Sequence, residues 1–139
     1  MVEEHTIKRT LVEITDDPAH DERTETEEFE SNRKKLISMG ITCFSCGSKE
    51  KLEAHHIVEW AYFNKISKRK MKKLLRVFDP YGYSQKLIKT TIKDPDDIRN
   101  LIILCKKCHR LKYTGIHEVS FPAWVAQACA RDQEIILKK

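Results

Sequence analysis

Apolar positions recur along the chain in patterns that predict both strands and helices. Residues 7–14 are rich in β-branched side chains and predict a short strand, as do residues 52–58. The apolar run Leu101–Leu104 predicts a buried strand. Helical periodicity predicts four helices, over about residues 24–39, 59–78, 105–113 and 122–136.

Capping and breaking residues set the expected ends of these elements. Thr24 or Thr26 can cap the first helix, and Gly40 ends it. Proline, aspartate and glycine predict turns at residues 16–22, 79–82 and 94–97. Residues 84–93 suit a helix or a strand. In the last helix four side chains are expected to pack inward, namely Trp124, Val125, Ala128 and Cys129.

Charge divides the 139-residue chain into two parts. Residues 1–31 hold 11 acidic and 3 basic side chains, a net charge of −8, so the total of +5 leaves +13 for residues 32–139. We expect an acidic N-terminal arm over residues 1–31, made of a strand and the start of a helix, and one domain over residues 32–139. A body this basic attracts polyanions, of which nucleic acid is the commonest, although a merely soluble surface would carry the same charge.

The N-terminus is polar and acidic and shows no secretory signal. No apolar run approaches the ~20 residues that cross a membrane. The cytoplasm is therefore the expected compartment. Because thiols stay reduced there, the five cysteines favour metal binding over disulfides.

Four of the cysteines form two pairs with the same spacing, Cys43–Cys46 and Cys105–Cys108. The two-residue gap lets both thiolates of a pair reach one tetrahedral ion, so two pairs complete a closed shell of four thiolates. This predicts a structural zinc ion, whose binding contributes on the order of 10 kcal/mol to folding. The alternative is four scattered core cysteines, which two matched pairs make less favourable. Cys129 is expected to be a core residue.

Two adjacent histidines, His55 and His56, lie in the second predicted strand. Neighbouring side chains of a strand point to opposite faces, so one imidazole can bind a metal while the other acts as a base. The alternative is two unrelated surface histidines, and the pair alone does not decide between them.

The order of these motifs resembles the HNH nuclease family in the form that a zinc finger supports. The chain presents Cys43-x-x-Cys46, then Glu53-Ala-His55-His56-Ile57, then Asn100-Leu101, then Leu104-Cys105-x-x-Cys108-His109. The matching region runs from Cys43 to about Tyr113. The resemblance implies an α+β fold: a ββα-metal (His-Me finger) core with paired CxxC zinc knuckles, a helical basic insertion over about residues 59–93, and flanking helices.

The resemblance also implies a role for each matching residue. His55 and His109 correspond to the ligands of a catalytic divalent ion, His56 to the general base, and Asn100 to the residue that orients the site through backbone hydrogen bonds. A neutral imidazole can take a proton from water near neutral pH. The implied activity is hydrolysis of DNA phosphodiesters with Mg²⁺ or Mn²⁺, leaving a 5′-phosphate and a 3′-hydroxyl. Imidazole ligands also accept Ni²⁺, Co²⁺ or Zn²⁺.

Some HNH relatives carry a further histidine ligand one helical turn after the second one, where this chain has Tyr113. His117 lies four residues later still, and eight residues of unbroken helix rise ~12 Å. A break at Gly115 would let His117 return to the metal. A phosphate contact or a plain surface position is the favoured alternative.

The expected insertion carries seven cations in twelve residues, with Ile66, Met71, Leu74 and Leu75 left to pack. Beside a nuclease site we expect these cations to contact phosphates of double-stranded DNA, whereas a solvated charged helix is the alternative. The seven are Lys65, Lys68, Arg69, Lys70, Lys72, Lys73 and Arg76.

Two other function classes fit parts of the pattern. A non-catalytic zinc module that binds nucleic acid would share the cysteines and the basic body, but it has no need of His55, His56, Asn100 and His109 together. The chain resembles the small stand-alone HNH proteins of phages and mobile elements. This resemblance implies that it acts in a bacterial or phage-infected cell. The chain could therefore act as a homodimer or as an accessory of a larger DNA-processing machine.

Overall fold

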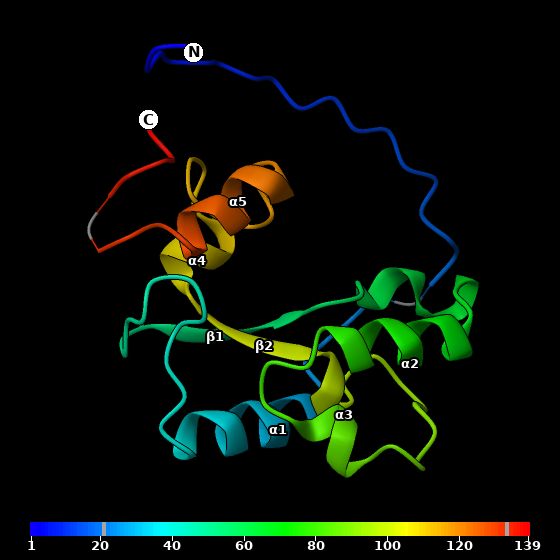
Figure 1. Ribbon diagram of the computed structural model, residues 1–139. Helices are drawn as coiled ribbons and strands as arrows, with labels where there is room; N and C mark the ends of the chain where they lie inside the picture. Colours follow the sequence, from blue (N-terminus) through cyan, green and yellow to red (C-terminus); the bar gives the residue numbers. More distant parts are fainter. Residues whose placement is uncertain (21, 133) are drawn as a thin grey trace.

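A two-stranded antiparallel sheet lies at the centre of the computed structural model, which describes residues 1–20, 22–132 and 134–139 (Figure 1). Strand β1 (Leu52–His56) pairs with β2 (Leu101–Cys105) in a register that sets Leu52 opposite Cys105 and His56 opposite Leu101. The predicted α+β class is confirmed. The sheet brings the two halves of the motif together across more than forty residues of intervening chain.

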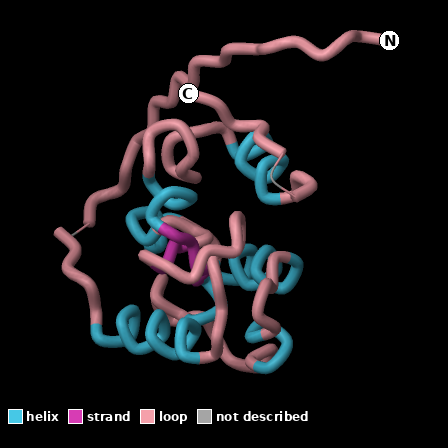
Figure 2. The backbone as a smooth tube through the Cα atoms, turned by 90° about the vertical axis from the view of Figure 1, so that its left-hand side faces the viewer, coloured by secondary structure: helices cyan, strands magenta, loops and turns pink. Residues whose placement is uncertain are grey.

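Helices flank this sheet on both faces, with the strands between them (Figures 1 and 2). In chain order they are α1 (Glu27–Ser38), the 3₁₀ helix η1 (Trp60–Lys65), α2 (Lys68–Val77), α3 (Tyr83–Lys86), the 3₁₀ helix η2 (Ile98–Asn100), α4 (Lys106–Arg110) and α5 (Phe121–Ala128).

Strand β2 is buried on both faces, and its side chains alternate between two cores. Leu101 and Ile103 pack with Phe29 and Leu36 of α1. Ile102 and Leu104 pack with the cysteines and with Trp124 of α5. The same alternation on β1 turns Ala54 and His56 toward α1, whereas Glu53 and His55 face α4.

Helix α1 forms where capping residues predict it. The Thr26 hydroxyl accepts a hydrogen bond from the backbone N–H of Phe29 at 3.0 Å, so Thr26 rather than Thr24 is the cap. Glutamates fill the first turn, where they complement the helix dipole. The helix is followed by Gly40, which has a φ of +80° and reverses the chain toward the first cysteine pair.

The basic insertion is helical but broken. Ile66 and Ser67 separate η1 from α2, and the Ser67 hydroxyl caps α2 by accepting from the Lys70 N–H at 3.2 Å. Met71 and Leu75 anchor α2 against Ile57 and Val58, which directly follow β1. Leu74 was expected to pack, but it is half exposed because it lies at the flank of the face that Met71 and Leu75 bury.

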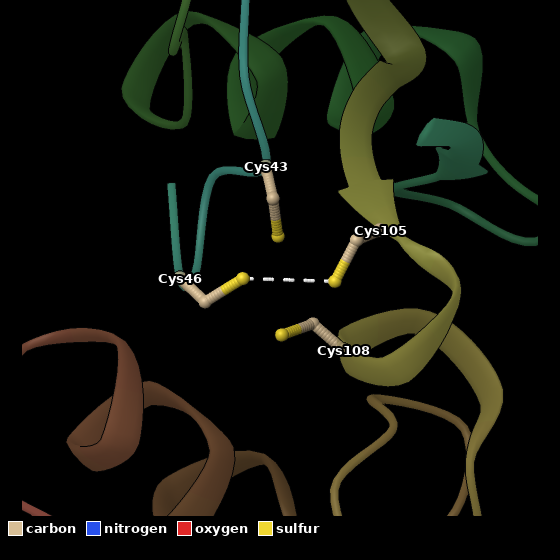
Figure 3. A group of neighbouring side chains, drawn as sticks. All are labelled: Cys43, Cys46, Cys105 and Cys108. Carbon is tan, nitrogen blue, oxygen red and sulfur yellow. Dashed lines mark hydrogen bonds between the residues drawn. The ribbon is translucent and has the colours of Figure 1, made fainter. Parts of the chain in front are cut away.

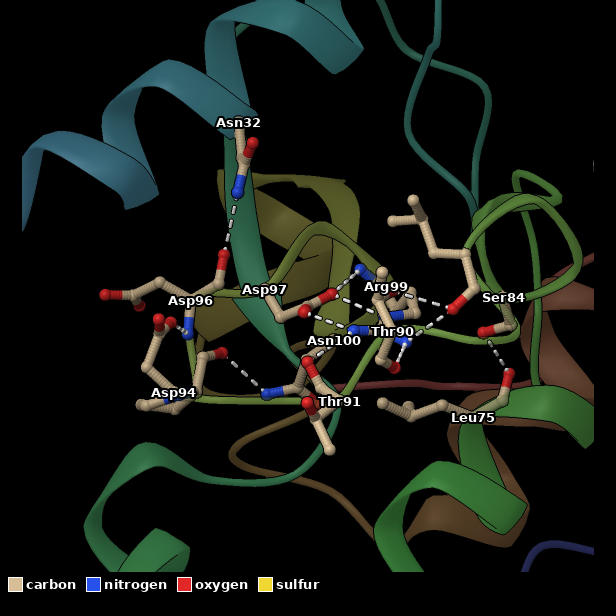
Figure 4. Close-up of polar contacts among 12 residues, drawn as sticks. Asn32, Leu75, Ser84, Thr90, Thr91, Asp94, Asp96, Asp97, Arg99 and Asn100 are labelled. Atoms are coloured by element: carbon tan, nitrogen blue, oxygen red, sulfur yellow. Dashed lines mark hydrogen bonds and ion pairs between the residues drawn. The ribbon is translucent and has the colours of Figure 1, made fainter. Parts of the chain in front are cut away.

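The segment that leads into β2 is held by a buried arginine. The Arg99 guanidinium donates to both carboxylate oxygens of Asp97, at 2.8 and 2.7 Å (Figure 4). It also donates to the backbone oxygens of Leu87, Thr90 and Thr91, so the buried charge is paired and its donors are satisfied. Residues 84–93, open between helix and strand in the sequence, form only the end of α3 and irregular chain.

Several predicted elements differ from the structure. Residues 7–14 form no strand, and Ile7, Leu11 and Val12 are exposed. The helix expected to reach Tyr113 ends at Arg110. The turn predicted at residues 16–22 includes residue 21, which lies outside the described part of the chain.

The last helix, expected to reach about Ile136, ends at Ala128. The chain beyond it folds back, and the Gln127 side chain accepts from the backbone N–H groups of Ile136 and Leu137 at 2.7 and 3.0 Å. Cys129 is therefore exposed and is not the core residue we expected, whereas Trp124 is buried. Residue 133, within the range expected to be helical, lies outside the described residues. In the described part of the chain, no helix is both long enough and apolar enough to span a membrane.

Candidate metal centres and active site

The four paired cysteines converge on one point (Figure 3). Cys43 and Cys46 come from the loop after α1, Cys105 from the end of β2, and Cys108 from α4. Their sulfur atoms all lie within 4.8 Å of one another, and the Sγ atoms of Cys46 and Cys105 are 3.6 Å apart. Tetrahedral Zn²⁺ with Zn–S bonds of ~2.3 Å needs sulfur atoms about 3.8 Å apart, so this cluster fits a zinc site.

Backbone hydrogen bonds dock the first cysteine loop onto the sheet. The Phe44 N–H donates to the Ile103 oxygen at 2.9 Å, and the Gly47 N–H donates to the Cys43 oxygen at 2.9 Å. Within the cluster, a hydrogen bond with the Cys108 thiol lowers the pKa of Cys43 to about 4. A thiolate is the form that binds zinc, so this lowered pKa is consistent with a zinc ligand.

A second cluster consists of three histidines on the α4 face of the sheet. His55 comes from β1, His109 from α4, and His117 from the loop after α4. The Nε2 atom of His117 lies 3.2 Å from Nδ1 of His55 and 3.1 Å from Nε2 of His109. Nitrogen ligands at ~2.0–2.1 Å from a tetrahedral ion lie about 3.3 Å apart, so the three imidazoles can share one ion.

His117 reaches this cluster because α4 is short. After Arg110 the chain turns back, and Gly115 packs so closely that a Cβ atom there would lie 2.6 Å from the Arg110 nitrogen. The Ile116 N–H then donates to the Cys108 oxygen at 2.9 Å, and the His117 N–H donates to the His109 oxygen at 3.3 Å. The separation expected from an unbroken helix is therefore absent, and His117 lies close to both His55 and His109.

The chemistry of the three imidazoles suits metal binding. Burial, followed by the nearby His117 and His109, lowers the pKa of His55 to about 3. Burial also lowers the pKa of His109, and it outweighs the opposing effect of Glu53. Both imidazoles are therefore neutral near pH 7 and have a lone pair to donate.

Glu53 fixes the orientation of His109. Its carboxylate accepts a hydrogen bond from Nδ1 of His109 at 2.9 Å and pairs with Arg110. His109 therefore carries its proton on Nδ1 and turns the lone pair of Nε2 toward His55 and His117. Carboxylates commonly orient metal-binding histidines in this way. Glu53 has no role in the sequence prediction, although its position two residues before His55 on one strand was a usable signal.

His56, by contrast, lies on the α1 face. Its ring stacks on Phe29 with centroids 5.1 Å apart, and its Nε2 atom is 2.8 Å from Oδ1 of Asp96. Burial lowers the pKa of His56, although the hydrogen bond with Asp96 acts in the opposite direction. The two neighbouring histidines thus occupy different environments, as strand alternation predicts.

Asn100 joins the two ends of the site. Its side chain is fully buried, accepts from the Val58 N–H at 2.8 Å, and donates to the oxygens of Val58 and Pro95 at 3.0 and 2.8 Å. Its backbone oxygen accepts from the Ile57 N–H at 2.8 Å. It therefore ties the chain leaving His56 to the loop before β2.

The family model of HNH endonucleases matches residues 43–111. This segment holds both cysteine pairs, His55, His56, Asn100 and His109. It is an HNH endonuclease domain. HNH endonucleases are nucleases, and their domains act on DNA. No curated protein and no solved structure matched the chain.

The basic helix α2 lies within the HNH domain, between the two halves of its motif. Of the seven predicted contact residues only Lys72 is half-buried, and the other six are exposed. No ion pair forms between these seven and any carboxylate within residues 1–20, 22–132 and 134–139. A hollow is lined by Arg69, Lys70 and Lys73. The surface therefore presents unneutralised positive charge.

A second hollow lies beside the histidine cluster of the HNH domain, across the free edge of β1. Its lining joins α1 to α4 and includes both charges of the Glu53–Arg110 pair, together with Phe29, Arg33 and His109. The family match begins after α1, so part of this lining comes from outside the matched segment.

Proposed function

We propose that this chain is a metal-dependent endonuclease that hydrolyses phosphodiester bonds of DNA. The observation that carries the proposal is the convergence of three imidazoles, those of His55, His109 and His117, while His56 on the same strand as His55 lies on the other face of the sheet. A module that only binds nucleic acid needs a zinc knuckle and a basic surface, but it has no use for an open cluster of nitrogen ligands.

The three histidines would hold one divalent ion and leave positions for water and phosphate. When bound, such an ion neutralises charge that develops on the scissile phosphate and on the departing oxygen. Mg²⁺ prefers oxygen ligands, whereas imidazoles suit transition ions. Of the ions predicted from the sequence, we therefore favour Mn²⁺ over Mg²⁺, and we include Ni²⁺, Co²⁺ and Zn²⁺ as alternatives.

His56 would act as the general base. A neutral imidazole can take a proton from the attacking water, and a low pKa keeps it neutral at physiological pH. His56 is the last residue of β1, so a phosphate bound at this end of the sheet can be approached from both faces. Asn100 would keep the chain after His56 in place. The products would be a 5′-phosphate and a 3′-hydroxyl.

Helix α2 would bind the DNA backbone. Its exposed, unpaired cations suit phosphates and carry no sequence information, so the contact would position the duplex without selecting a site. Replacing Arg69, Lys70 and Lys73 together with alanine should lower the slope of log Kd against log salt by about 2.7, at ~0.9 per lost phosphate contact. Binding titrations at several salt concentrations measure the slope, and an unchanged slope would show that α2 faces away from DNA.

Plasmid cleavage tests the proposal directly. Purified protein with Mn²⁺ should nick or cut supercoiled plasmid, and His56→Ala should lower kcat by about 10²- to 10⁴-fold, the usual contribution of a general base. His20→Ala, which removes an exposed histidine of the arm, is the matched control and should leave the rate unchanged. Both variants should keep their zinc. Salt-sensitive DNA binding with no cleavage under any divalent ion would favour the non-catalytic module instead.

A further inference from the structure

The loop before η2 places a buried carboxylate against His56. Asp96 is 2% exposed, and its Oδ1 atom lies 2.8 Å from Nε2 of His56. In the sequence, Asp94-Pro95-Asp96-Asp97 indicates only a turn. The turn is present, since the Asp96 N–H donates to the Asp94 side chain at 2.8 Å, but it also delivers the Asp96 carboxylate to the site.

Three residues from the start of the chain hold Asp96 in place. The Thr26 hydroxyl donates to its second carboxylate oxygen at 2.6 Å, and the Arg23 guanidinium pairs with the first. The Asn32 amide of α1 donates to its backbone oxygen at 2.9 Å (Figure 4). The carboxylate thus takes its donors from residues 70 and 73 positions away in the chain, and these contacts fix its orientation toward His56.

These contacts fix the charge state of Asp96. Burial on its own would raise the pKa of Asp96, but hydrogen bonds from Thr26, His56 and Arg23 outweigh it and lower that pKa. An ionised carboxylate can only accept hydrogen bonds, so Nε2 of His56 must carry the proton.

The other ring nitrogen of His56 is then free to act. Within residues 1–20, 22–132 and 134–139, no side chain hydrogen-bonds Nδ1 of His56. The His56 side chain is 13% exposed, so solvent reaches part of it. The ring also cannot tilt freely, because Phe29 stacks on its face at 5.1 Å.

We propose that Asp96 is a positioning residue that holds His56 in the Nε2–H tautomer, which leaves the lone pair on Nδ1, and that residues 23–32 are a working part of the active site. The proposal rests on the assignment of His56 as general base. Arg23, Thr26, Phe29 and Asn32 all lie outside the segment that matches the HNH family, so this support belongs to the flanking part of the chain.

The tautomer can be read without any activity. Long-range ¹H–¹⁵N spectra of the full-length, zinc-loaded protein, at a pH where His56 is neutral, should show His56 protonated on Nε2 alone. His56→Gln identifies the resonance. Protonation on Nδ1, or a mixture of both forms, would overturn the proposal, and this wild-type measurement needs no variant to fold.

Asp96→Ala then tests the consequence. It removes the oxygen that accepts from Nε2 of His56, so this contact no longer holds the proton on Nε2 and the ring should populate both tautomers. We expect kcat for plasmid cleavage to fall by about 10²- to 10⁴-fold, as for loss of the base itself, with KM and zinc content unchanged. Asp94→Asn, on the same turn but without contact to His56, is the control and should keep both tautomer and kcat.

The outcomes separate this proposal from the proposed function. If wild-type protein cleaves no DNA but His56 is protonated on Nε2, the nuclease assignment fails while the Asp96–His56 pair stands. If wild-type protein cleaves DNA and Asp96→Ala keeps both kcat and the tautomer, the nuclease assignment stands and the role of Asp96 is refuted.

Discussion

The two candidate metal clusters take side chains from the same short stretch of chain, and we assign them opposite purposes. Strand β2 and helix α4 supply Cys105 and Cys108 to one cluster and His109 to the other. The cysteine cluster has four soft ligands, three of them buried, and no open position. The histidine cluster has three nitrogen ligands, and His117 is exposed. One cluster is closed as a structural site is, and the other is open as a catalytic site must be.

The shared stretch of chain would also let the cysteine cluster set the position of a histidine in the candidate active site. His109 directly follows Cys108, so an ion in the closed cluster fixes the first turn of α4 and with it one ligand of the open cluster. The Trp124 indole donates to the Cys108 oxygen at 3.0 Å and supports the same turn from α5. The comparison predicts that loss of a cysteine of the closed cluster lowers stability, metal binding and activity together. Loss of a histidine of the open cluster should lower only metal binding and activity.

Loss of a cysteine ligand should have the largest effect. Cys105→Ser should release zinc and unfold the domain, because structural zinc contributes on the order of 10 kcal/mol, close to the whole stability of a small domain. Zinc content and thermal unfolding measure this. Cys129→Ser, which changes the exposed cysteine, should leave both unchanged. A folded, zinc-free Cys105→Ser protein would show that the cluster is not a structural site.

Loss of His117 should leave the fold intact and weaken the open cluster. His117→Ala removes one of three nitrogen ligands, so Mn²⁺ affinity should fall by more than the 10- to 100-fold typical of an outer-shell partner. Calorimetric titration of zinc-loaded protein with Mn²⁺ measures the affinity, with His20→Ala as the matched control. Equal affinity in His117→Ala and wild type would return His117 to the surface role that its sequence position favours.

Loss of Glu53 should have a smaller effect on the same cluster. Glu53→Ala removes the acceptor that holds the Nδ1 proton of His109, and metal affinity should fall by about 10- to 100-fold. Glu50→Ala, which changes an exposed glutamate in the loop before β1, is the control. If Glu53→Ala binds Mn²⁺ as tightly as wild type, then Glu53 serves only to pair with Arg110.

Local patterns in the sequence were sufficient for the parts of the site that depend on spacing. The two cysteine pairs predict a four-sulfur cluster, and strand alternation separates His55 from His56. Both features follow from the covalent geometry of a few neighbouring residues. The functional roles of His55, His56, Asn100 and His109 rest on the family relationship and stay proposals.

The parts of the fold and site that the sequence does not predict depend on contacts between segments far apart in the chain. Asp96 meets Arg23 and Thr26 across 73 and 70 positions, and nothing local marks that pairing. His117 joins the cluster only because the chain reverses after Arg110, which the spacing of a continuous helix does not predict. The strand expected over residues 7–14 failed for the converse reason: β-branched residues favour a strand, but a strand forms only where a partner exists.

A metal-loaded crystal structure tests the comparison between the two clusters most directly. Anomalous diffraction from crystals soaked in Mn²⁺ should place zinc among the four cysteine sulfur atoms. It should place manganese at about 2.0–2.3 Å from Nδ1 of His55 and from Nε2 of His109 and His117. The account predicts both ions at once, with open coordination positions only on the manganese. Zinc in the cysteine cluster with no ion among the three histidines would contradict it.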